Sequence, residues 1–415
     1  MIKCMKNKII NFLRWSQNHT KTDMVYVVSG SFWWILGKIG ILFIGFVAMV
    51  AFANWLPKKS YGTYQFVIAG LVLLSIFTLA ELNTALVKSI AQKKEGTLQL
   101  AVRKKMKWGL VGSFLSLGLA AWYFLQENDL LATAFLLGAL FIPFKETFRI
   151  FIHFWLGRKK FDLQAKYDLI STTLNAALLI PTIYLTNNVL IIIAVFLASH
   201  TFFNWLFYRR TLKQIINNEE DKSAISFGKN LTLINALQTA AEYIDKIIIW
   251  KFLGAIPVAI YSFAQLPIQK VRDMLPIVPL ALPKLGENKI DENRKNGVIS
   301  KFLRLFGFTI PAAVILALVA PLLYRLFFPQ YLESAMYFQA LSGIIAISPF
   351  LLLTAALTAE TKKKALYVTN TGAPFLKIIL FFVLIPHFGI WGIVAAILIA
   401  ELLRDLLALY FFLRM

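Results

Sequence analysis

Positively charged side chains interrupt long apolar stretches of this sequence, and their chemistry demands an explanation. Six of them lie inside segments otherwise rich in Leu, Ile, Val and Phe: Lys38, Lys145, Arg149, Lys270, Arg272 and Lys377. A charge at the centre of a bilayer costs about 2.5–3.5 kcal/mol on insertion scales, so each one needs water, an acidic partner or access to the interface. Because Lys binds phosphate as a point charge and Arg binds it as a fork, these cations predict a hydrated site for an anionic ligand.

The spacing of the cations indicates which of them share a helix face. Lys145, Arg149 and His153 follow one another at intervals of four residues, which places them in one stripe. Arg149 also lies close enough to the end of its segment to reach the interface, and His153 is interpreted as an ordinary interfacial histidine. Lys38 and Lys377 lie near mid-segment and have no acid three or four residues away. We therefore expect these two to face a wet cavity or a neighbouring helix.

Acidic residues accompany some of the other charges at helical spacing. Glu242 precedes Lys246 by four residues and Glu401 precedes Arg404 by three, so both spacings allow a structural ion pair on one helix. Acids inside apolar segments are also the groups that bind a coupling ion in transporters. Three residues are candidates for that role: Glu81, Asp245 and Glu401.

One apolar segment carries a continuous polar face. Asn235, Gln238, Glu242 and Asp245 are separated by three, four and three residues, which places them on one side of a helix. This pattern predicts a helix that lines a hydrated interior. The alternative is an amphipathic helix lying in the membrane interface, which would invert the inside–outside order of every later connection.

The elements that position these charges must be membrane-spanning helices. Hydrophobic residues make up 59% of the 415 residues, and charged residues make up 15%, well below the roughly 25% typical of soluble proteins. A water-soluble surface cannot be built from this composition. We therefore predict an all-α polytopic membrane protein. Its single cysteine, Cys4, excludes a disulfide framework.

Twelve apolar segments have the length that a membrane span requires, which is about 20 helical residues. They are 26–53, 62–87, 108–126, 130–156, 166–186, 188–208, 228–253, 256–283, 302–323, 333–359, 364–386 and 388–413. Basic residues are concentrated at the N-terminus and in the connections after every second segment. The connections on the other side of the membrane have only four basic residues, Lys58, Lys59, Lys251 and Arg325. By the positive-inside rule both termini are predicted to be cytoplasmic. The net charge of +22 therefore reflects topology, and nucleic acid is not an expected partner.

An internal repeat divides the chain into two halves. Three residues recur at a constant offset of 197 positions: Leu56, Tyr64 and Phe66 correspond to Leu253, Tyr261 and Phe263. Six segments return the chain to its starting side, so the halves are related by a pseudo-two-fold axis along the membrane normal. We predict two six-helix lobes, 1–215 and 216–415, with a cleft between them. This architecture is typical of alternating-access transporters.

The two repeated turns also carry a family resemblance. The stretches ANWLPKKSYGTYQFV and EYIDKIIIWKFLGAIPVAIYSFAQLPI, in a chain of twelve segments and two halves, resemble the polysaccharide-exporter or oligosaccharide-flippase family. This family belongs to the superfamily that also holds the multidrug-and-toxin extruders and the lipid II flippases. Four residues fit the pattern of its second-half stretch: Asp245, Leu253, Gly254 and Tyr261. The lipid II branch usually has fourteen spans, which argues against that branch.

The resemblance implies both a function and a set of site residues. Members of the family transfer undecaprenyl-diphosphate-linked oligosaccharides from the cytoplasmic to the outer leaflet of the bacterial inner membrane, through a cleft lined by cations. By position within the segments, this substrate-binding role falls on the six cations named first. The implied partners are an anionic lipid-linked oligosaccharide, membrane lipid and other polysaccharide-assembly proteins. We expect a monomer that uses no cofactor and no metal.

Two other function classes remain open on the sequence. An ion-coupled antiporter for drugs or cations would use buried acids, and the candidates are Glu81, Glu242, Asp245 and Glu401. The charged residues in the middle of the apolar segments are mostly cationic, which argues against this class. A polysaccharide polymerase, ligase or glycosyltransferase needs a sizeable domain outside the membrane, and the connections are too short for one. The sequence has no P-loop, so the energy source is an ion gradient, the membrane potential or consumption of the product. We therefore predict a transporter and not an enzyme.

Overall fold

The computed structural model describes residues 24–275, 277–278, 281, 285, 291–360 and 363–414. Nearly all of these residues are helical, and no strand occurs among them. The predicted all-α class is therefore confirmed. Helices are expected for an apolar chain of this kind because backbone groups inside a bilayer must be hydrogen-bonded within each element. The N-terminal basic residues up to Lys21 lie outside the described residues.

The first half of the chain supplies six helical rods, two of which are interrupted. Its elements are α2 (Met24–Trp55), α3 (Lys58–Ser75), η1 (Ile76–Thr78), α4 (Leu82–Ala91), α5 (Thr97–Leu125), α6 (Asp129–Phe148), α7 (Phe151–Gly157), α8 (Phe161–Leu185) and α9 (Val189–Leu212). Leu79 adopts a left-handed backbone conformation with φ 57° and separates η1 from α4. Arg149 and Ile150 separate α6 from α7. The predicted spans 62–87 and 130–156 are therefore broken helices.

The second half is more irregular. Its elements are α10 (Lys222–Leu253), α11 (Ala255–Asp273), α13 (Glu292–Phe327), η2 (Pro329–Tyr331), α14 (Ser334–Leu341), α15 (Gly343–Ala346), α16 (Phe350–Ala359), α17 (Lys363–Tyr367), η3 (Val368–Gly372, a π-helical turn) and α18 (Ala373–Leu413). Gly389, with φ 57° and ψ −134°, kinks α18 at the boundary between the last two predicted spans. The end of predicted span 256–283 lies partly outside the described residues.

The described helices are long and apolar enough for a membrane protein. Eight helical segments among them are long and apolar enough to cross a membrane. The number is nine if the bent pair Ser334–Ala346 and Phe350–Ala359 forms one span. The last of the eight, Lys364–Leu413, contains two predicted spans on either side of the kink at Gly389. The remaining predicted spans lie on α10 and α11, which carry the charged and amide side chains noted above. Each of the twelve predicted spans therefore overlaps helical backbone in the part of the chain that the structure describes.

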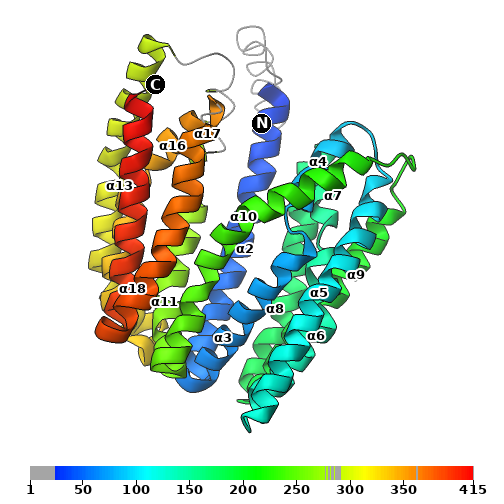
Figure 1. The fold of residues 1–415 in the computed structure, drawn as a ribbon, viewed down its shortest axis with the longest axis vertical. Coiled ribbons are helices and arrows are strands. Elements are labelled where there is room, and N and C mark those ends of the chain that lie inside the picture. Colours follow the sequence, from blue (N-terminus) through cyan, green and yellow to red (C-terminus); the bar gives the residue numbers. More distant parts are fainter. Residues whose placement is uncertain are drawn as a thin grey trace, which may run out of the picture.

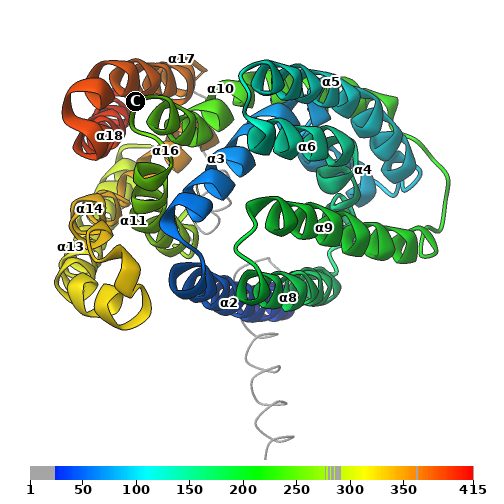
Figure 2. The same ribbon diagram turned by 90° about the horizontal axis from the view of Figure 1, so that it is seen from below.

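Two groups of helices lie side by side. Helices α2 to α9 form one group and α11 to α18 form the other, as Figures 1 and 2 show. Helix α10 runs between them and packs on α3 and α4 of the first group as well as on α11 and α18 of the second. Because α10 extends from one end of the bundle to the other, it is a crossing helix and not an interfacial one.

The helices that follow the two repeated turns pack against each other and join the two groups. Helix α3 begins at Lys58 and α11 begins at Ala255, which is an offset of 197 residues, as the sequence repeat predicts. The two helices cross so closely that a Cβ atom on Gly62 would lie 1.8 Å from the carbonyl oxygen of Ala255. The ring of Tyr61 packs on that of Phe263, with centroids 4.7 Å apart. Equivalent elements of the two halves thus form the contact between them.

Connections of two kinds occupy opposite ends of the bundle. The turns at 56–57, 126–128, 186–188 and 254 lie at one end, which we call the short-turn end. The connections 92–96, 158–160 and 213–221 lie at the other, which we call the basic end. The start of α2 and the end of α18 also lie at the basic end (Figure 1). This alternation agrees with the predicted order of the connections.

Polar contacts tie the two halves together at the short-turn end. The Asn54 side chain donates to the carbonyl oxygen of Phe327 at 3.0 Å, and the Gln330 side chain donates to the carbonyl oxygen of Asn54 at 3.2 Å. Lys58 forms an ion pair with Glu333. Together with the crossing of α3 and α11, these contacts close the short-turn end.

A buried ion pair joins three connections at the basic end. Arg158 binds both carboxylate oxygens of Glu95, at 2.8 and 2.6 Å, and the backbone N–H of Ile216 donates to the same carboxylate at 2.7 Å. Burial opposes ionisation of Glu95, but the hydrogen bonds from Arg158 and Ile216 outweigh it and hold its pKa below the usual range. The carboxylate therefore fixes the three connections in their relative positions.

Replacing Gly62 by Ala is expected to destabilise the protein, because the new methyl group would overlap the backbone of Ala255. Overpacking of this kind costs about 1–3 kcal/mol. Thermal unfolding in detergent measures the effect as a lower apparent Tm. Gly118→Ala is the matched control, since Gly118 is also helical and has no atom within 4 Å of the added Cβ. An unchanged Tm in Gly62→Ala would contradict the close crossing.

Replacing Glu95 by Gln is expected to lower stability at neutral pH by roughly 2–4 kcal/mol, because the Arg158 guanidinium loses its charged partner. The depressed pKa of Glu95 stabilises the wild type above the pKa of the unfolded carboxyl, and this contribution is lost as the pH falls through the folded pKa. The Tm difference between variant and wild type should therefore shrink on acidification. Glu220→Gln, at an exposed position, is the control.

Candidate functional site

The second half contains a polar cavity of about 80 Å³ between α10, η3 and α18. Its polar lining side chains are Gln238, Glu242, Thr369, Asn370, Lys377, Glu401 and Arg404. The π-helical turn η3 contributes two of them, and such turns are frequent at functional sites because they redirect side chains. Gln238 and Glu242 come from the predicted polar face of α10. The cavity is large enough for a few water molecules.

Two of the cations near this cavity are neutralised by one carboxylate. Glu401 accepts hydrogen bonds from Arg272 at 3.0 Å and from Arg404 at 2.7 Å. Arg404 also contacts Asp405 at 2.8 Å. The predicted Glu401–Arg404 pair is therefore confirmed, and Arg272, a predicted ligand residue, is held by the same acid. With both guanidinium groups bound to it, Glu401 is a poor candidate for binding a coupling ion.

Lys377 differs from these cations. Its side chain lines the cavity, and its ammonium group lies 5.5 Å from the centroid of the Phe381 ring, one turn further along α18. No hydrogen bond or ion pair holds this ammonium in the part of the chain that the structure describes. A cation over an aromatic ring is stabilised but keeps its charge and its hydrogen-bonding capacity. Lys377 is therefore available to bind an anion in the cavity.

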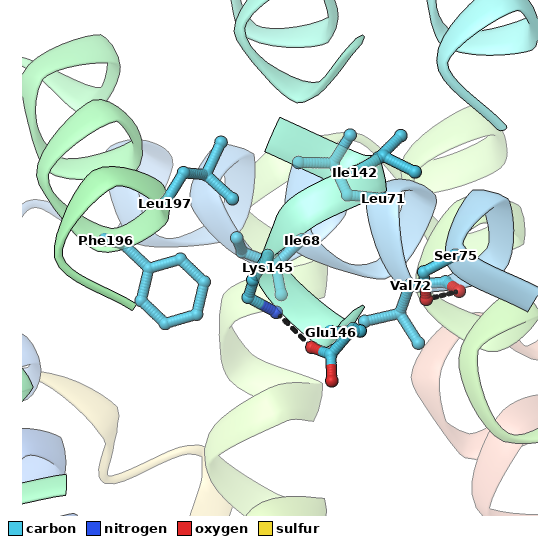
Figure 3. A pocket seen from close by; sticks show the side chains of 9 residues that line it. All are labelled: Ile68, Leu71, Val72, Ser75, Ile142, Lys145, Glu146, Phe196 and Leu197. Carbon is cyan, nitrogen blue, oxygen red and sulfur yellow. Dashed lines mark hydrogen bonds and ion pairs between the residues drawn. The ribbon is translucent and has the colours of Figure 1, made fainter. Parts of the chain in front are cut away.

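The first half holds a smaller site around Lys145. The Lys145 ammonium donates to Glu146 at 2.7 Å and lies 5.3 Å from the centroid of the Phe196 ring of α9. Figure 3 shows this ammonium between the carboxylate and the ring, at the edge of a cavity of about 20 Å³ that α3, α6 and α9 line. Arg149, at the end of α6, pairs with Asp168 at 3.0 Å. Both predicted cations thus have an acidic partner.

Lys38 and Lys270 occupy different surroundings from the other predicted cations. Lys38 is exposed on α2, and Lys270 is exposed near the end of α11. Neither side chain lines either of the two cavities described above. Of the six predicted cations, Lys377 lines the cavity in the second half, and Arg272 contacts that lining only through Glu401. Lys145 borders the cavity in the first half.

The other predicted acids link helices. Asp245 is fully buried and accepts hydrogen bonds from Tyr261 at 2.5 Å and from Gln265 at 3.0 Å, which joins α10 to α11. The predicted Glu242–Lys246 pair does not form among the described residues, because the Lys246 ammonium turns to Gln265, at 3.4 Å. This expectation was wrong because an acceptor on a neighbouring helix competes with one on the same helix.

Glu81 and Lys105 meet at the break in the second rod. The Glu81 carboxylate accepts a hydrogen bond from Asn235 of α10 at 3.0 Å. Lys105 is 1% exposed and donates to Asn83 at 3.1 Å and to the carbonyl oxygen of Leu79 at 3.5 Å. Sequence reasoning placed Lys105 in a basic connection and missed this role. The left-handed backbone conformation of Leu79, whose carbonyl oxygen accepts from Lys105, has no simple signal in the sequence.

Comparisons with known proteins agree with this architecture. The profile of a family described as polysaccharide biosynthesis protein matches residues 51–336. No curated protein matches the chain significantly in sequence. The fold resembles that of a MOP-superfamily transporter from Pyrococcus furiosus (TM-score 0.62, 14% identity, 91% of this chain and 94% of the other covered).

Two further structures have the same fold. One is the lipid II flippase MurJ in an inward closed conformation (TM-score 0.63, 14% identity, 92% and 87% covered). The other is a multidrug resistance MATE family transporter in an outward-facing conformation (TM-score 0.58, 16% identity, 91% and 94% covered). These likenesses confirm the predicted MATE-like arrangement of two lobes.

Replacing Glu401 by Gln is expected to destabilise the second half strongly, because Arg272 and Arg404 would share a neutral partner. Removing one member of a buried ion pair costs roughly 3–5 kcal/mol. The apparent Tm in detergent should fall well below that of the wild type. Glu220→Gln again controls for the loss of one carboxylate. A wild-type Tm for Glu401→Gln would show that Glu401 is not the common partner of the two arginines.

Proposed function

The chain belongs to the polysaccharide biosynthesis protein family, and from this premise we propose that it is a flippase for an undecaprenyl-diphosphate-linked oligosaccharide. It acts in the inner membrane of a bacterium as a multi-pass protein with both termini in the cytoplasm. Transport proceeds by alternating access of a cleft between the two lobes. The proposal involves no chemical step on the sugar, because the passenger only changes leaflet.

The observation that carries the proposal is Lys377, an ammonium group in a polar cavity without a carboxylate bound to it. A diphosphate headgroup presents several acceptor oxygens and more than one negative charge, which an unpaired ammonium can bind. The polyprenyl tail needs no protein site because it stays in the lipid. Lys145 offers a second cation in the other lobe, which is already paired with Glu146.

The direction of loading follows from the closed short-turn end. If the basic end faces the cytoplasm, as the positive-inside rule predicts, the contacts of Asn54 and Lys58 with the second lobe close the outer side. The cavity at Lys377 is then approached from the cytoplasm, where lipid-linked oligosaccharides are assembled. Membrane lipid and polysaccharide-assembly proteins are the partners that this role requires.

A second candidate function is an ion-coupled antiporter for cationic compounds. The exposed carboxylate of Glu242, which lines the same cavity, favours it. Under this alternative, loss of Glu242 would sensitise cells to cationic drugs and would leave surface polysaccharide unchanged. Drug susceptibility of a Glu242→Gln strain separates the two functions.

Replacing Lys377 by Gln is expected to reduce surface polysaccharide at least tenfold in cells that depend on this protein, because the headgroup loses its principal charged contact. Undecaprenyl-linked oligosaccharide should accumulate in the inner leaflet. Surface polysaccharide staining and analysis of extracted lipids measure both effects, with protein levels followed by immunoblot. Lys213→Gln, which removes an exposed cation at the basic end, is the matched control. Normal polysaccharide at normal protein levels would refute Lys377 as the headgroup site.

A further inference from the structure

Glu242 and Lys377 line the same cavity from opposite helices. Glu242 lies on α10 and Lys377 on α18, and the ammonium attracts the Glu242 carboxylate electrostatically. The two groups do not form a direct ion pair, although both are among the described residues. Glu242 accepts one long hydrogen bond, from Gln238 at 3.4 Å. Its carboxylate therefore keeps most of its capacity to accept hydrogen bonds.

The other charges around the cavity already have partners. Arg272 and Arg404 bind Glu401, and Arg404 also binds Asp405. Lys246, which the sequence pairs with Glu242, turns instead to Gln265. Among the described residues, Glu242 is thus the carboxylate of the cavity lining that has no cation bound directly to it, and Lys377 is the corresponding cation. The two unpaired charges of opposite sign therefore share one cavity.

We propose that Glu242 is the internal counter-anion of Lys377, which an anionic headgroup must displace in order to bind. The inference rests on the proposed flippase function and adds a residue that regulates the same site. In the empty protein the carboxylate lowers the energy of an otherwise uncompensated ammonium. A diphosphate group outcompetes it because it carries more charge and more acceptor oxygens than one carboxylate. Glu242 thereby weakens binding of the passenger.

This weakening serves transport. A carrier must bind its passenger tightly enough to load it and weakly enough to release it. When the headgroup leaves, Glu242 attracts Lys377 again and makes rebinding less favourable. The two residues lie on α10 and α18, which pack against each other. The exchange of partners therefore needs no contact with the helices α2 to α9.

Binding of inorganic pyrophosphate to the purified full chain in detergent tests the proposal. We expect Glu242→Gln to bind pyrophosphate about tenfold more tightly than the wild type, since one opposing charge is removed close to the ammonium. Lys377→Gln should bind at least tenfold more weakly. In the Lys377→Gln background, Glu242→Gln should change binding by less than about twofold, because the competition no longer exists. Glu242→Asp, which keeps the charge, should resemble the wild type and shows that the site tolerates substitution.

The outcomes separate the inference from the function beneath it. If Lys377→Gln weakens binding but Glu242→Gln does not tighten it, the counter-anion role is wrong and the proposed site stands. If Glu242→Gln tightens binding equally with and without Lys377, Glu242 acts as a general repulsive charge, and the inference is again overturned. If Lys377→Gln binds like the wild type, both the site and the inference fail. In cells, the Glu242→Gln variant should transfer the lipid-linked oligosaccharide more slowly than the wild type, in spite of its tighter binding. The control variant Glu220→Gln should transfer it at the wild-type rate.

Discussion

A charge inside a bilayer must be paired, hydrated or carried to the interface, and this constraint determines what each buried charge here can do. Arg272 and Arg404 satisfy it through Glu401, and Lys145 satisfies it through Glu146. Glu401 links α11 to α18 through Arg272, whereas Glu146 is the neighbour of Lys145 on α6. These paired cations have fewer hydrogen bonds left for a ligand than Lys377 has. Lys377 instead lines a polar cavity and lies over an aromatic ring, and no hydrogen bond or ion pair to another described residue holds its ammonium. The same energetic requirement thus separates structural cations from a binding cation.

The pattern of the sequence predicted the helices better than it predicted the partners of their charges. The offset of 197 residues is visible in the sequence because equivalent turns, before Lys58 and before Ala255, experience equivalent packing in the two lobes. The polar face of α10 was also predictable, since helical spacing alone places Gln238 and Glu242 on one side. Local spacing correctly gave Glu401–Arg404, although Asp405 and Arg272 also contact these two residues.

Partners on other helices could not be predicted in this way. Arg272 and Glu401 are 129 positions apart, and nothing in either segment indicates the other. The pairing of Glu242 with Lys246 failed because Gln265, on the next helix, offered the ammonium an acceptor. Lys105 was assigned to a connection because α5 begins at Thr97, about three turns before its apolar segment. Tertiary packing decides these cases, and a single sequence contains no record of it.

Helix α10 connects these observations, because its polar face serves three purposes along its length. Before the midpoint of the helix, Asn235 binds Glu81 at the break between α3 and α4 in the first lobe. About two turns further on, Glu242 lines the cavity at Lys377, and Asp245 then binds Tyr261 of α11. A rigid rotation of the two lobes cannot preserve all of these contacts at once. Either α10 bends between its two sets of partners, or the contact with Glu81 breaks, so opening of the short-turn end must change the environment of this helix and with it the position of Glu242.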